Sequence, residues 1–195
     1  MKPVNIGILG LGTVGSGAVQ VLQGNAAEIK RRLGRAMEVF MVSTRNTEKA
    51  RELCPNALVS TDPFDVVKHP EVDIVVELFG GTDIARELVL EAVRNGKHVV
   101  TANKKLLAEY GNEIFALAEE KNVMVHFEAA VAGGIPIIKA LREGLSANNI
   151  RSIAGIINGT SNFILSEMRE KGSAFADVLK EAQADPGSYR DLLVR

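Results

Sequence analysis

Three glycines near the start of the chain have the spacing of a phosphate-binding turn. The stretch GLGTVG places them at Gly10, Gly12 and Gly15, directly after an apolar run. At this spacing Gly10 can form a tight turn, Gly12 leaves no Cβ in the way of a pyrophosphate, and Gly15 lets a following helix pack closely on the strand. The backbone N–H groups of Thr13 and Val14 would point at the phosphates, with the helix dipole behind them. We therefore predict a bound dinucleotide; the alternative is a strand–helix turn that is tight for packing alone.

Selectivity for NAD or NADP is expected to depend on the residues at the end of the second strand, where NAD enzymes carry an acidic residue. The sequence there is MVSTRNTEKAR, in which Ser43 and Thr44 are neutral, Arg45 follows them and Lys49 comes one helical turn later. A guanidinium group matches a 2′-phosphate, so this pattern favours NADP. The alternative interpretation is that Arg45 and Lys49 belong to the solvated start of a helix.

Three further stretches follow expected strands, at the edge of a parallel sheet where ligands bind. They are ELFGGTD (77–83), TANKK (101–105) and FEAAVAGGIP (127–136). Gly81 permits close approach, Thr82 offers a hydroxyl group, Lys104 a positive charge and Glu128 a carboxylate. Taken singly, Lys104 could be a helix-start lysine in water and Glu128 a buried carboxylate that accepts loop amides. Because they converge on one edge, we predict a site there.

The elements that must position these residues alternate between two periodicities. Short apolar, β-branched runs predict strands at residues 4–9, 38–44, 57–61, 72–78, 98–103 and 123–131. Helical patterns are expected at 85–96 and 106–122, and in the first helix Val14, Ala18, Val21 and Leu22 recur at helical spacing. This alternation predicts an α/β fold with a doubly wound parallel sheet and right-handed crossovers, in a domain of residues 1–131.

The sequence pattern changes over residues 132–195, which predicts the beginning of a second domain of α+β type. A glycine turn with a proline near a helix start occupies residues 132–145, and a strand, a small-residue turn and a helix are expected within 150–168. An amphipathic helix follows at 174–183, and residues 184–195 have the composition of an abrupt tail.

Composition excludes several classes of protein. The 195 residues carry a formal net charge of -1 with scattered basic residues, which argues against a nucleic-acid partner. No apolar run reaches the roughly 18 residues of a membrane span, and no signal peptide is evident. The single cysteine, Cys54, cannot form an intrachain disulfide and is expected to be a small buried residue. These features predict a cytoplasmic protein.

Four stretches together resemble homoserine dehydrogenase. They are GILGLGTVGSG, VVELFGGTDIARELVLEAVRNGKHVVTANKKLLAEYG, FEAAVAGGIPIIKALREGLSANNI and GIINGTSNFILSEM. The resemblance covers about residues 3–183 and is carried most specifically by GKHVVTANK and EAAVAGGIPII. It implies a Rossmann-type domain, a small-molecule substrate, a homodimer, and NAD- or NADP-dependent interconversion of L-homoserine and L-aspartate 4-semialdehyde on the way to threonine, methionine and isoleucine.

The resemblance also implies roles for individual residues. Gly10, Gly12, Thr13, Val14 and Gly15 match the family's dinucleotide turn, Arg45 its 2′-phosphate contact, and Gly81 and Thr82 a loop beside the cofactor. Lys104 matches the lysine near the nicotinamide and substrate, either as a base or relay for the hydroxyl proton or as an anchor for the substrate's charge. Glu128, Val131, Gly133 and Ile135 match a loop that holds a sodium ion through oxygen atoms.

The sequence departs from the family after EAQ (181–183). The family continues there with an element that grips the substrate ammonium and with a second lysine, whereas ADPGSYRDLLVR follows here and the last lysine is Lys180. We therefore expect cofactor binding with very weak or absent homoserine oxidation by this chain. The alternatives are a catalytically silent dinucleotide-binding module and, less favoured by the TANK and EAAVAGGIP motifs, another small-substrate dehydrogenase such as an amino-acid or semialdehyde reductase.

Overall fold

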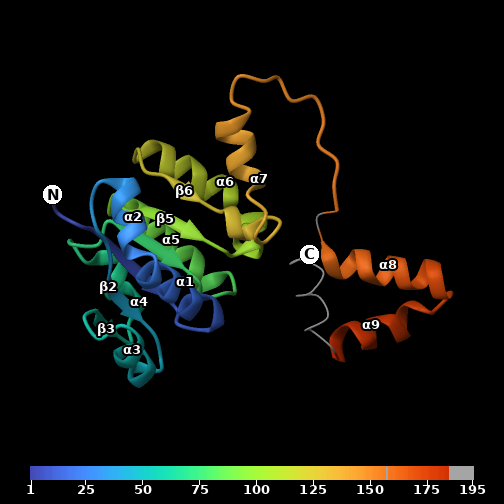
Figure 1. Ribbon diagram of the computed structural model, residues 1–195, viewed down its shortest axis with the longest axis horizontal. Coiled ribbons are helices and arrows are strands. Elements are labelled where there is room, and N and C mark those ends of the chain that lie inside the picture. Colours follow the sequence, from blue (N-terminus) through green and yellow to red (C-terminus); the bar gives the residue numbers. More distant parts are fainter. Residues whose placement is uncertain (157, 185–195) are drawn as a thin grey trace. The chain divides into compact units, whose positions relative to one another are not determined.

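The computed structural model describes residues 1–156 and 158–184 (Figure 1). The chain divides into two compact units, Met1–Ala130 and a second that begins at Val131, and each is described by itself. Most of the expected tail, residues 185–195, and Ile157 in the expected strand–turn–helix segment lie outside the described residues.

The first unit is built on one parallel sheet. Its strands are β1 (Val4–Leu9), β2 (Met37–Ser43), β3 (Leu58–Ser60), β4 (Ile74–Glu77), β5 (His98–Thr101) and β6 (Val125–His126). Their order in the sheet is β3-β2-β1-β4-β5-β6, and every neighbouring pair is parallel. The predicted doubly wound sheet is therefore confirmed. The strand order reverses beside β1, which opens a crevice at the carboxyl ends of β1 and β4.

The helices of this unit are α1 (Thr13–Gly24), α2 (Ala26–Leu33), α3 (Thr47–Leu53), α4 (Pro63–Lys68), α5 (Asp83–Arg94) and α6 (Lys104–Glu120). Sequence patterns did not predict α2 or α4. Helix α2 buries none of its residues and α4 has only six, so neither shows the long run of buried apolar positions on which the other helices were predicted.

The expected strand at 123–131 is wrong over most of its length. Only Val125 and His126 form β6, and a 3-10 turn, η1 (Glu128–Ala130), follows directly. Phe127, the next residue after β6, packs through its ring, which lies 5.2 Å from the ring of Phe115.

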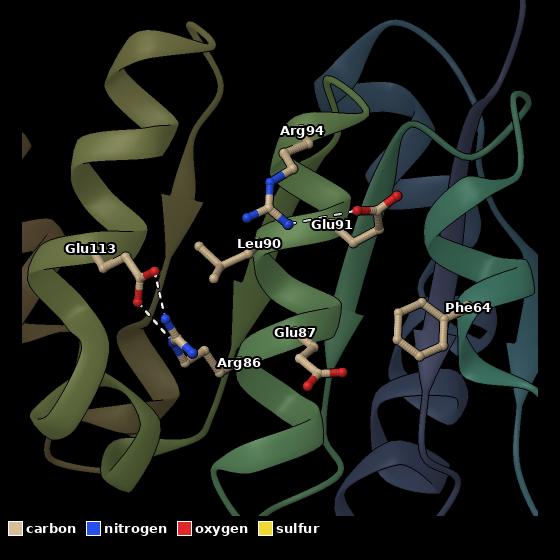
Figure 2. Close-up of a pocket in the computed structure, with 7 residues that line it drawn as sticks. All are labelled: Phe64, Arg86, Glu87, Leu90, Glu91, Arg94 and Glu113. Carbon is tan, nitrogen blue, oxygen red and sulfur yellow. Dashed lines mark hydrogen bonds and ion pairs between the residues drawn. The ribbon is translucent and has the colours of Figure 1, made fainter.

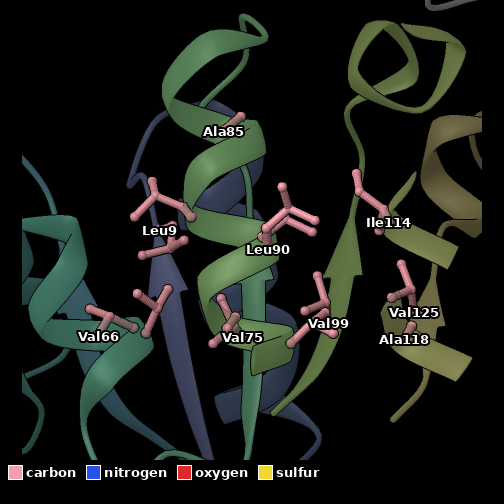
Figure 3. Packing of buried hydrophobic residues seen from close by; sticks show 14 of the residues in the cluster. Leu9, Val66, Val75, Ala85, Leu90, Val99, Ile114, Ala118 and Val125 are labelled. Atoms are coloured by element: carbon pink, nitrogen blue, oxygen red, sulfur yellow. The ribbon is translucent and has the colours of Figure 1, made fainter. Parts of the chain in front are cut away.

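The core lies on both faces of the sheet, because alternate residues of a strand point to opposite sides. Leu9 of β1 joins a cluster with helices α4, α5 and α6, which Figure 3 shows around Val66, Leu90 and Ile114. Ile6 and Ile8 join a cluster on the other side that also contains Val19, Val42 and Cys54. Cys54 is 2% exposed and burial raises the pKa of its thiol, which confirms the prediction of a small buried residue.

The helix expected from the spacing of Val14, Ala18, Val21 and Leu22 is confirmed as α1, but these apolar residues are not all buried. Val14 and Val21 are each 60% exposed, whereas Gly15 and Val19 are buried. A Cβ on Gly15 would lie 2.1 Å from the carbonyl oxygen of Gly10, so this glycine is the point of closest approach to the turn after β1. The contact sets the rotation of the helix, and Val19, one turn further on, is then directed into the core.

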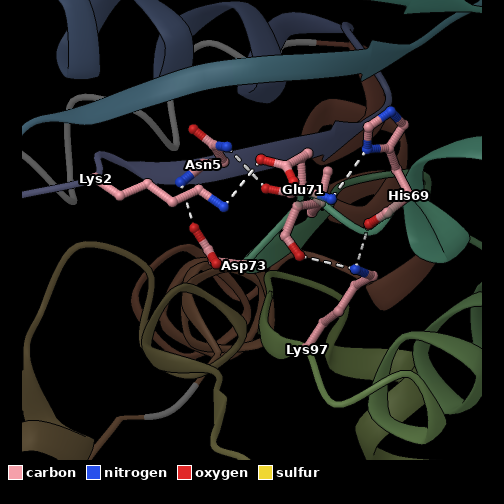
Figure 4. Close-up of polar contacts among 7 residues, drawn as sticks. Lys2, Asn5, His69, Glu71, Asp73 and Lys97 are labelled. Carbon is pink, nitrogen blue, oxygen red and sulfur yellow. Dashed lines mark hydrogen bonds and ion pairs between the residues drawn. The ribbon is translucent and has the colours of Figure 1, made fainter.

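The opposite edge of the sheet, before the strands begin, is closed by polar contacts (Figure 4). The backbone N–H of Asn5 donates to the carboxylate of Asp73 at 2.8 Å. Lys97 is 4% exposed, and its ammonium donates to the carbonyl oxygens of His69 at 2.6 Å and Val72 at 2.8 Å. Burial lowers the pKa of Lys97. These bonds fix the loop before β4 to β1 and β5.

The second unit contains α7 (Ile137–Lys139), a π-helical turn η2 (Ala140–Gly144), α8 (Gly159–Lys171) and α9 (Phe175–Ala184). Helices α8 and α9 share a small core of Ile164, Val178 and Ala182. Helix α8 starts at the NGTSN stretch, where the side chain of Asn158 accepts a hydrogen bond from the N–H of Ser161 at 3.0 Å.

The strand expected at the start of 150–168 is wrong for the described residues. Residues 150–156 adopt no regular secondary structure, although their sequence is apolar and β-branched. A strand needs a neighbour for its N–H and C=O groups, and no described residue of this unit pairs with this segment. Ile153 and Ile156 are accordingly 67% and 74% exposed.

Candidate functional site

The glycine turn joins three strands at the crevice. Gly10 has φ 93°, a left-handed conformation that favours glycine, and its N–H donates to the carbonyl of Ser43 at 2.9 Å. A Cβ on Gly10 would also lie 3.0 Å from the carbonyl oxygen of Leu78. The turn after β1 is thereby fixed against the ends of β2 and β4.

The start of α1 is open to an anion. Gly12 is the N-cap, and apart from its own chain neighbours no atom lies within 4 Å of the place that a Cβ would take. The first N–H groups of a helix have no intrahelical acceptor, and the first turn of α1 contains no acidic residue. The N–H groups of Thr13, Val14 and Gly15 therefore form a positive helix end that suits a phosphate.

Lys49 contacts this turn, which sequence analysis did not predict. Its ammonium donates to the carbonyl of Leu11 at 3.0 Å, from the first turn of α3. The side chain of Asn46 caps the same helix by accepting from the N–H of Lys49 at 3.0 Å. The spacing from Arg45 indicated that Lys49 faces the same edge, but the contact with Leu11 depends on how β1 and β2 pair.

A cavity of about 310 Å³ lies beside the turn. The cavity is lined by residues 43–45 at the end of β2 and by residues 61–64 after β3. Phe79 after β4 and Ile84 in α5 complete its walls. The apolar surfaces of Pro63, Phe79 and Ile84 suit the flat face of a nucleobase, and Arg45 belongs to the lining. The volume is in the range of small ligand sites.

The loops after β4 and β5 are held together by a buried carboxylate. Glu77 is fully buried, and its Oε1 accepts from the N–H of Phe79 at 2.9 Å while Oε2 accepts from the hydroxyl of Thr101 at 2.6 Å. The Thr101 hydroxyl in turn accepts from the N–H of Asn103 at 3.0 Å. Neither Glu77 nor Thr101 was singled out in the sequence.

Lys104 is placed by the next contacts. Asn103 caps α6 by accepting from the N–H of Leu106 at 3.1 Å, and its amide nitrogen donates to the carbonyl of Gly81 at 2.7 Å. Lys104 is the first residue of α6, and its side chain is exposed. The structure thus brings Gly81 and Lys104 to the same edge as the glycine turn. Thr82, the N-cap of α5, makes no side-chain capping bond.

The predicted sodium loop spans the division between the two units. Glu128 lies in the first unit, whereas Val131, Gly133 and Ile135 belong to the second. The backbone there turns through positive φ at both Ala132 (56°) and Gly133 (58°). The carbonyl of Ile135 already accepts from the N–H of Ile137 at 2.8 Å. Among the described residues no cluster of three or more His, Cys, Asp or Glu side chains could hold a metal, so a cation here would need carbonyl oxygens beside any oxygen of Glu128.

Another cavity of about 330 Å³ lies over helices α4, α5 and α6 (Figure 2). Arg86 makes two hydrogen bonds of 2.7 Å to the carboxylate of Glu113, and the pair raises the pKa of Arg86 and lowers that of Glu113. Arg94 lies 3.7 Å from Glu91. Because the arginines already face carboxylates, the strand-end edge is the better candidate site.

The doubly wound sheet, the glycine turn and the open start of α1 define a dinucleotide-binding protein of the Rossmann type. Residues 10–128 match the family model described as homoserine dehydrogenase, NAD binding domain, and residues 136–187 match the model described as homoserine dehydrogenase. The chain belongs to the homoserine dehydrogenase family.

Individual relatives agree. Homoserine dehydrogenase of Neisseria gonorrhoeae is 73% identical over 184 residues, which cover 94% of this chain and 42% of that protein. The crystal structure of a homoserine dehydrogenase from Thiobacillus denitrificans has a TM-score of 0.85 at 65% identity, over 96% of this chain and 43% of that one. A hyperthermophilic archaeal homoserine dehydrogenase in complex with NADPH has a TM-score of 0.75 at 30% identity, over 94% of this chain and 61% of that one. The chain thus spans less than half the length of the first two relatives.

Within residues 1–156 and 158–184, every helix is too short or too polar to cross a bilayer.

Proposed function

We propose that this chain binds NADP(H) and forms the cofactor-binding part of an enzyme that interconverts L-homoserine and L-aspartate 4-semialdehyde, a step towards threonine, methionine and isoleucine. One observation carries the proposal most directly. The open start of α1 at Gly12 follows Gly10, whose N–H donates to the carbonyl of Ser43, and Ser43 lines a cavity together with Arg45. A pyrophosphate at the helix start would place the adenosine half over that cavity.

The preference for NADP over NAD rests on charge. Arg45 follows the neutral residues Ser43 and Thr44, where an acidic residue would accept a ribose hydroxyl from NAD. Arg45 can form paired hydrogen bonds to a 2′-phosphate. Lys49 adds a second positive charge next to the turn. The archaeal relative solved with NADPH supports the same choice.

The reaction requires a hydride acceptor and a group that takes the hydroxyl proton. The nicotinamide ring supplies hydride chemistry when the cofactor is bound. Lys104 would act on the proton or hold the substrate's charge, and Gly81 and Thr82 would line the nicotinamide side. Asn103 caps α6 and bonds to Gly81, which supports these assignments by fixing Lys104 beside that loop.

Further assignments complete the proposal. Residues 1–131 would be the NAD(P)-binding domain and residues 132–195 part of the catalytic domain, in a cytoplasmic homodimer. Oxygen atoms of Glu128, Val131, Gly133 and Ile135 would hold a sodium ion. Oxygen donors suit a hard cation, and consecutive left-handed residues at 132 and 133 redirect the backbone between the donors.

A second candidate function is dinucleotide binding without turnover. The glycine turn and the open start of α1 would support this function without any further residue. Calorimetric titration with NADPH and NADH tests binding, and a steady-state assay with homoserine and NADP tests turnover. We expect tighter binding of NADPH than of NADH; homoserine oxidation would support the dehydrogenase activity, and binding without oxidation would support the second candidate. Failure to bind either cofactor would contradict the proposed function.

A further inference from the structure

Glu77 is a buried carboxylate with no role in the function proposed above. It ends β4, is fully buried, and each of its oxygens accepts a hydrogen bond, one from the N–H of Phe79 and one from the hydroxyl of Thr101. Burying a carboxylate costs free energy unless hydrogen bonds compensate for the lost water. An apolar side chain would avoid this cost, so the carboxylate has a use that depends on its two acceptors.

The two hydrogen bonds connect the loops that follow β4 and β5. Glu77 and Thr101 are direct neighbours in the parallel pairing of these strands. From Thr101 the contacts continue through the N–H of Asn103, whose amide reaches the carbonyl of Gly81. The contacts form a closed ring, because the loop that contains Gly81 also contains Phe79, which donates back to Glu77.

This ring lies on the half of the sheet that faces the second nucleotide. Each half of a doubly wound sheet takes one nucleotide of the dinucleotide, with the pyrophosphate at the turn after β1. The cavity lined by Arg45 lies mainly on the side of β2 and β3, so it would take the adenosine half, and Phe79 and Ile84 from the end of β4 close it. Strands β4 and β5 lie on the other side of β1. Their loops therefore face the nicotinamide half and carry Lys104.

We propose that Glu77 is a positioning residue that fixes the nicotinamide side of the site. This inference rests on the proposed function, that the chain binds NADP(H). Glu77 holds Phe79 to Gly81 against Thr101 and Asn103, and so sets the surface on which the nicotinamide nucleotide lies. A carboxylate is needed because the Phe79 N–H can only donate and the Thr101 hydroxyl donates as well. The amide of a glutamine would accept one of these bonds and leave the other without an acceptor.

The test compares a whole cofactor with half of one, in the full 195-residue chain. Titrations use NADPH and 2′,5′-ADP, which contains the adenosine half with its 2′-phosphate. Glu77→Gln should raise the Kd of NADPH about tenfold and raise the Kd of 2′,5′-ADP several times less, because Phe79 also lines the adenosine cavity. Glu38→Gln is the matched control, because Glu38 is an exposed residue of β2, and it should change neither value.

Thr101 variants provide a second test that does not depend on Glu77→Gln being folded. Thr101→Val keeps the side-chain volume but removes the hydroxyl, so it should raise the Kd of NADPH much more than the Kd of 2′,5′-ADP. Thr101→Ser keeps the hydroxyl and should bind NADPH like the unmodified chain. Equal losses for both ligands would mean a general structural role and overturn the proposal, as would unchanged NADPH binding in folded Glu77→Gln and Thr101→Val. If the unmodified chain binds neither ligand, the proposed function itself fails and this inference fails with it.

Discussion

Two alanine substitutions in the glycine turn should have opposite consequences. Gly15→Ala puts a Cβ 2.1 Å from the carbonyl oxygen of Gly10, and one of the two must retreat by about 0.9 Å to reach the 3.0 Å that real contacts require. Overpacking of this kind costs about 1–3 kcal/mol. Alanine regains up to about 1 kcal/mol in helix propensity. The backbone carbonyl cannot swing aside, so a net loss of about 1–2 kcal/mol is expected.

Gly12→Ala should leave the fold almost unchanged. No other atom lies within 4 Å of the new Cβ, and the φ of -70° is ordinary for any residue. The lower entropy of the unfolded chain stabilises by about 0.4–1 kcal/mol, and the poorer N-cap offsets most of it. The new methyl group occupies the space proposed for the pyrophosphate, so NADPH affinity should fall about 5- to 150-fold, the equivalent of about 1–3 kcal/mol of overpacking.

Thermal unfolding and calorimetric titration separate the two effects. Gly15→Ala should lower the Tm by about 3–10 °C. Gly12→Ala should keep the Tm within about 2 °C and lose cofactor affinity. Wild-type NADPH affinity in folded Gly12→Ala would refute the phosphate interpretation of the turn, and an unchanged Tm for Gly15→Ala would refute the packing argument.

Three further predictions follow from named contacts. Arg45→Ala should weaken NADPH binding by about 1.5–3 kcal/mol and leave NADH nearly unchanged in parallel titrations, and equal losses would contradict the 2′-phosphate assignment. Burial lowers the pKa of Lys97 below its ordinary 10.5, so the unfolded chain binds the proton more tightly and the free energy of unfolding should rise with pH just below that value. Denaturant unfolding between about pH 8 and pH 10 should show a steeper rise of the unfolding free energy with pH in the unmodified chain than in Lys97→Met. Identical slopes of unfolding free energy against pH in the two proteins would disprove it. In a complete version of the enzyme, Lys104→Ala should lower kcat for homoserine oxidation about 10²–10⁴-fold, and NADPH affinity falling by the same factor would argue against a role in proton transfer.

The sheet and the glycine turn could be predicted because their signals are local. Apolar strand runs and the spacing of Gly10, Gly12 and Gly15 lie within a few residues of one another. The buried face of α1 could not be predicted from apolar spacing, because the close contact between Gly15 and Gly10 sets the rotation of the helix.

The polar contacts that join Glu77, Thr101, Asn103 and Gly81 were also beyond prediction. Glu77 and Thr101 are 24 residues apart and meet only through the pairing of β4 with β5. The ammonium of Lys49 reaches Leu11 across 38 residues for a similar reason. The expected strand at the start of 150–168 failed because strand propensity supplies no partner for the backbone hydrogen bonds.

The central claim is that the carboxyl ends of the strands bind a dinucleotide, and mapping NADPH onto the backbone amides tests it most directly. Amide chemical shifts of the 21.0 kDa chain would be recorded during a titration with NADPH. The largest changes should fall at residues 10–15 and 43–45, and at residues 79–82 and 101–104 on the nicotinamide side. Changes concentrated instead around Arg86 and Glu113, or around Lys97 at the opposite edge, would contradict the account.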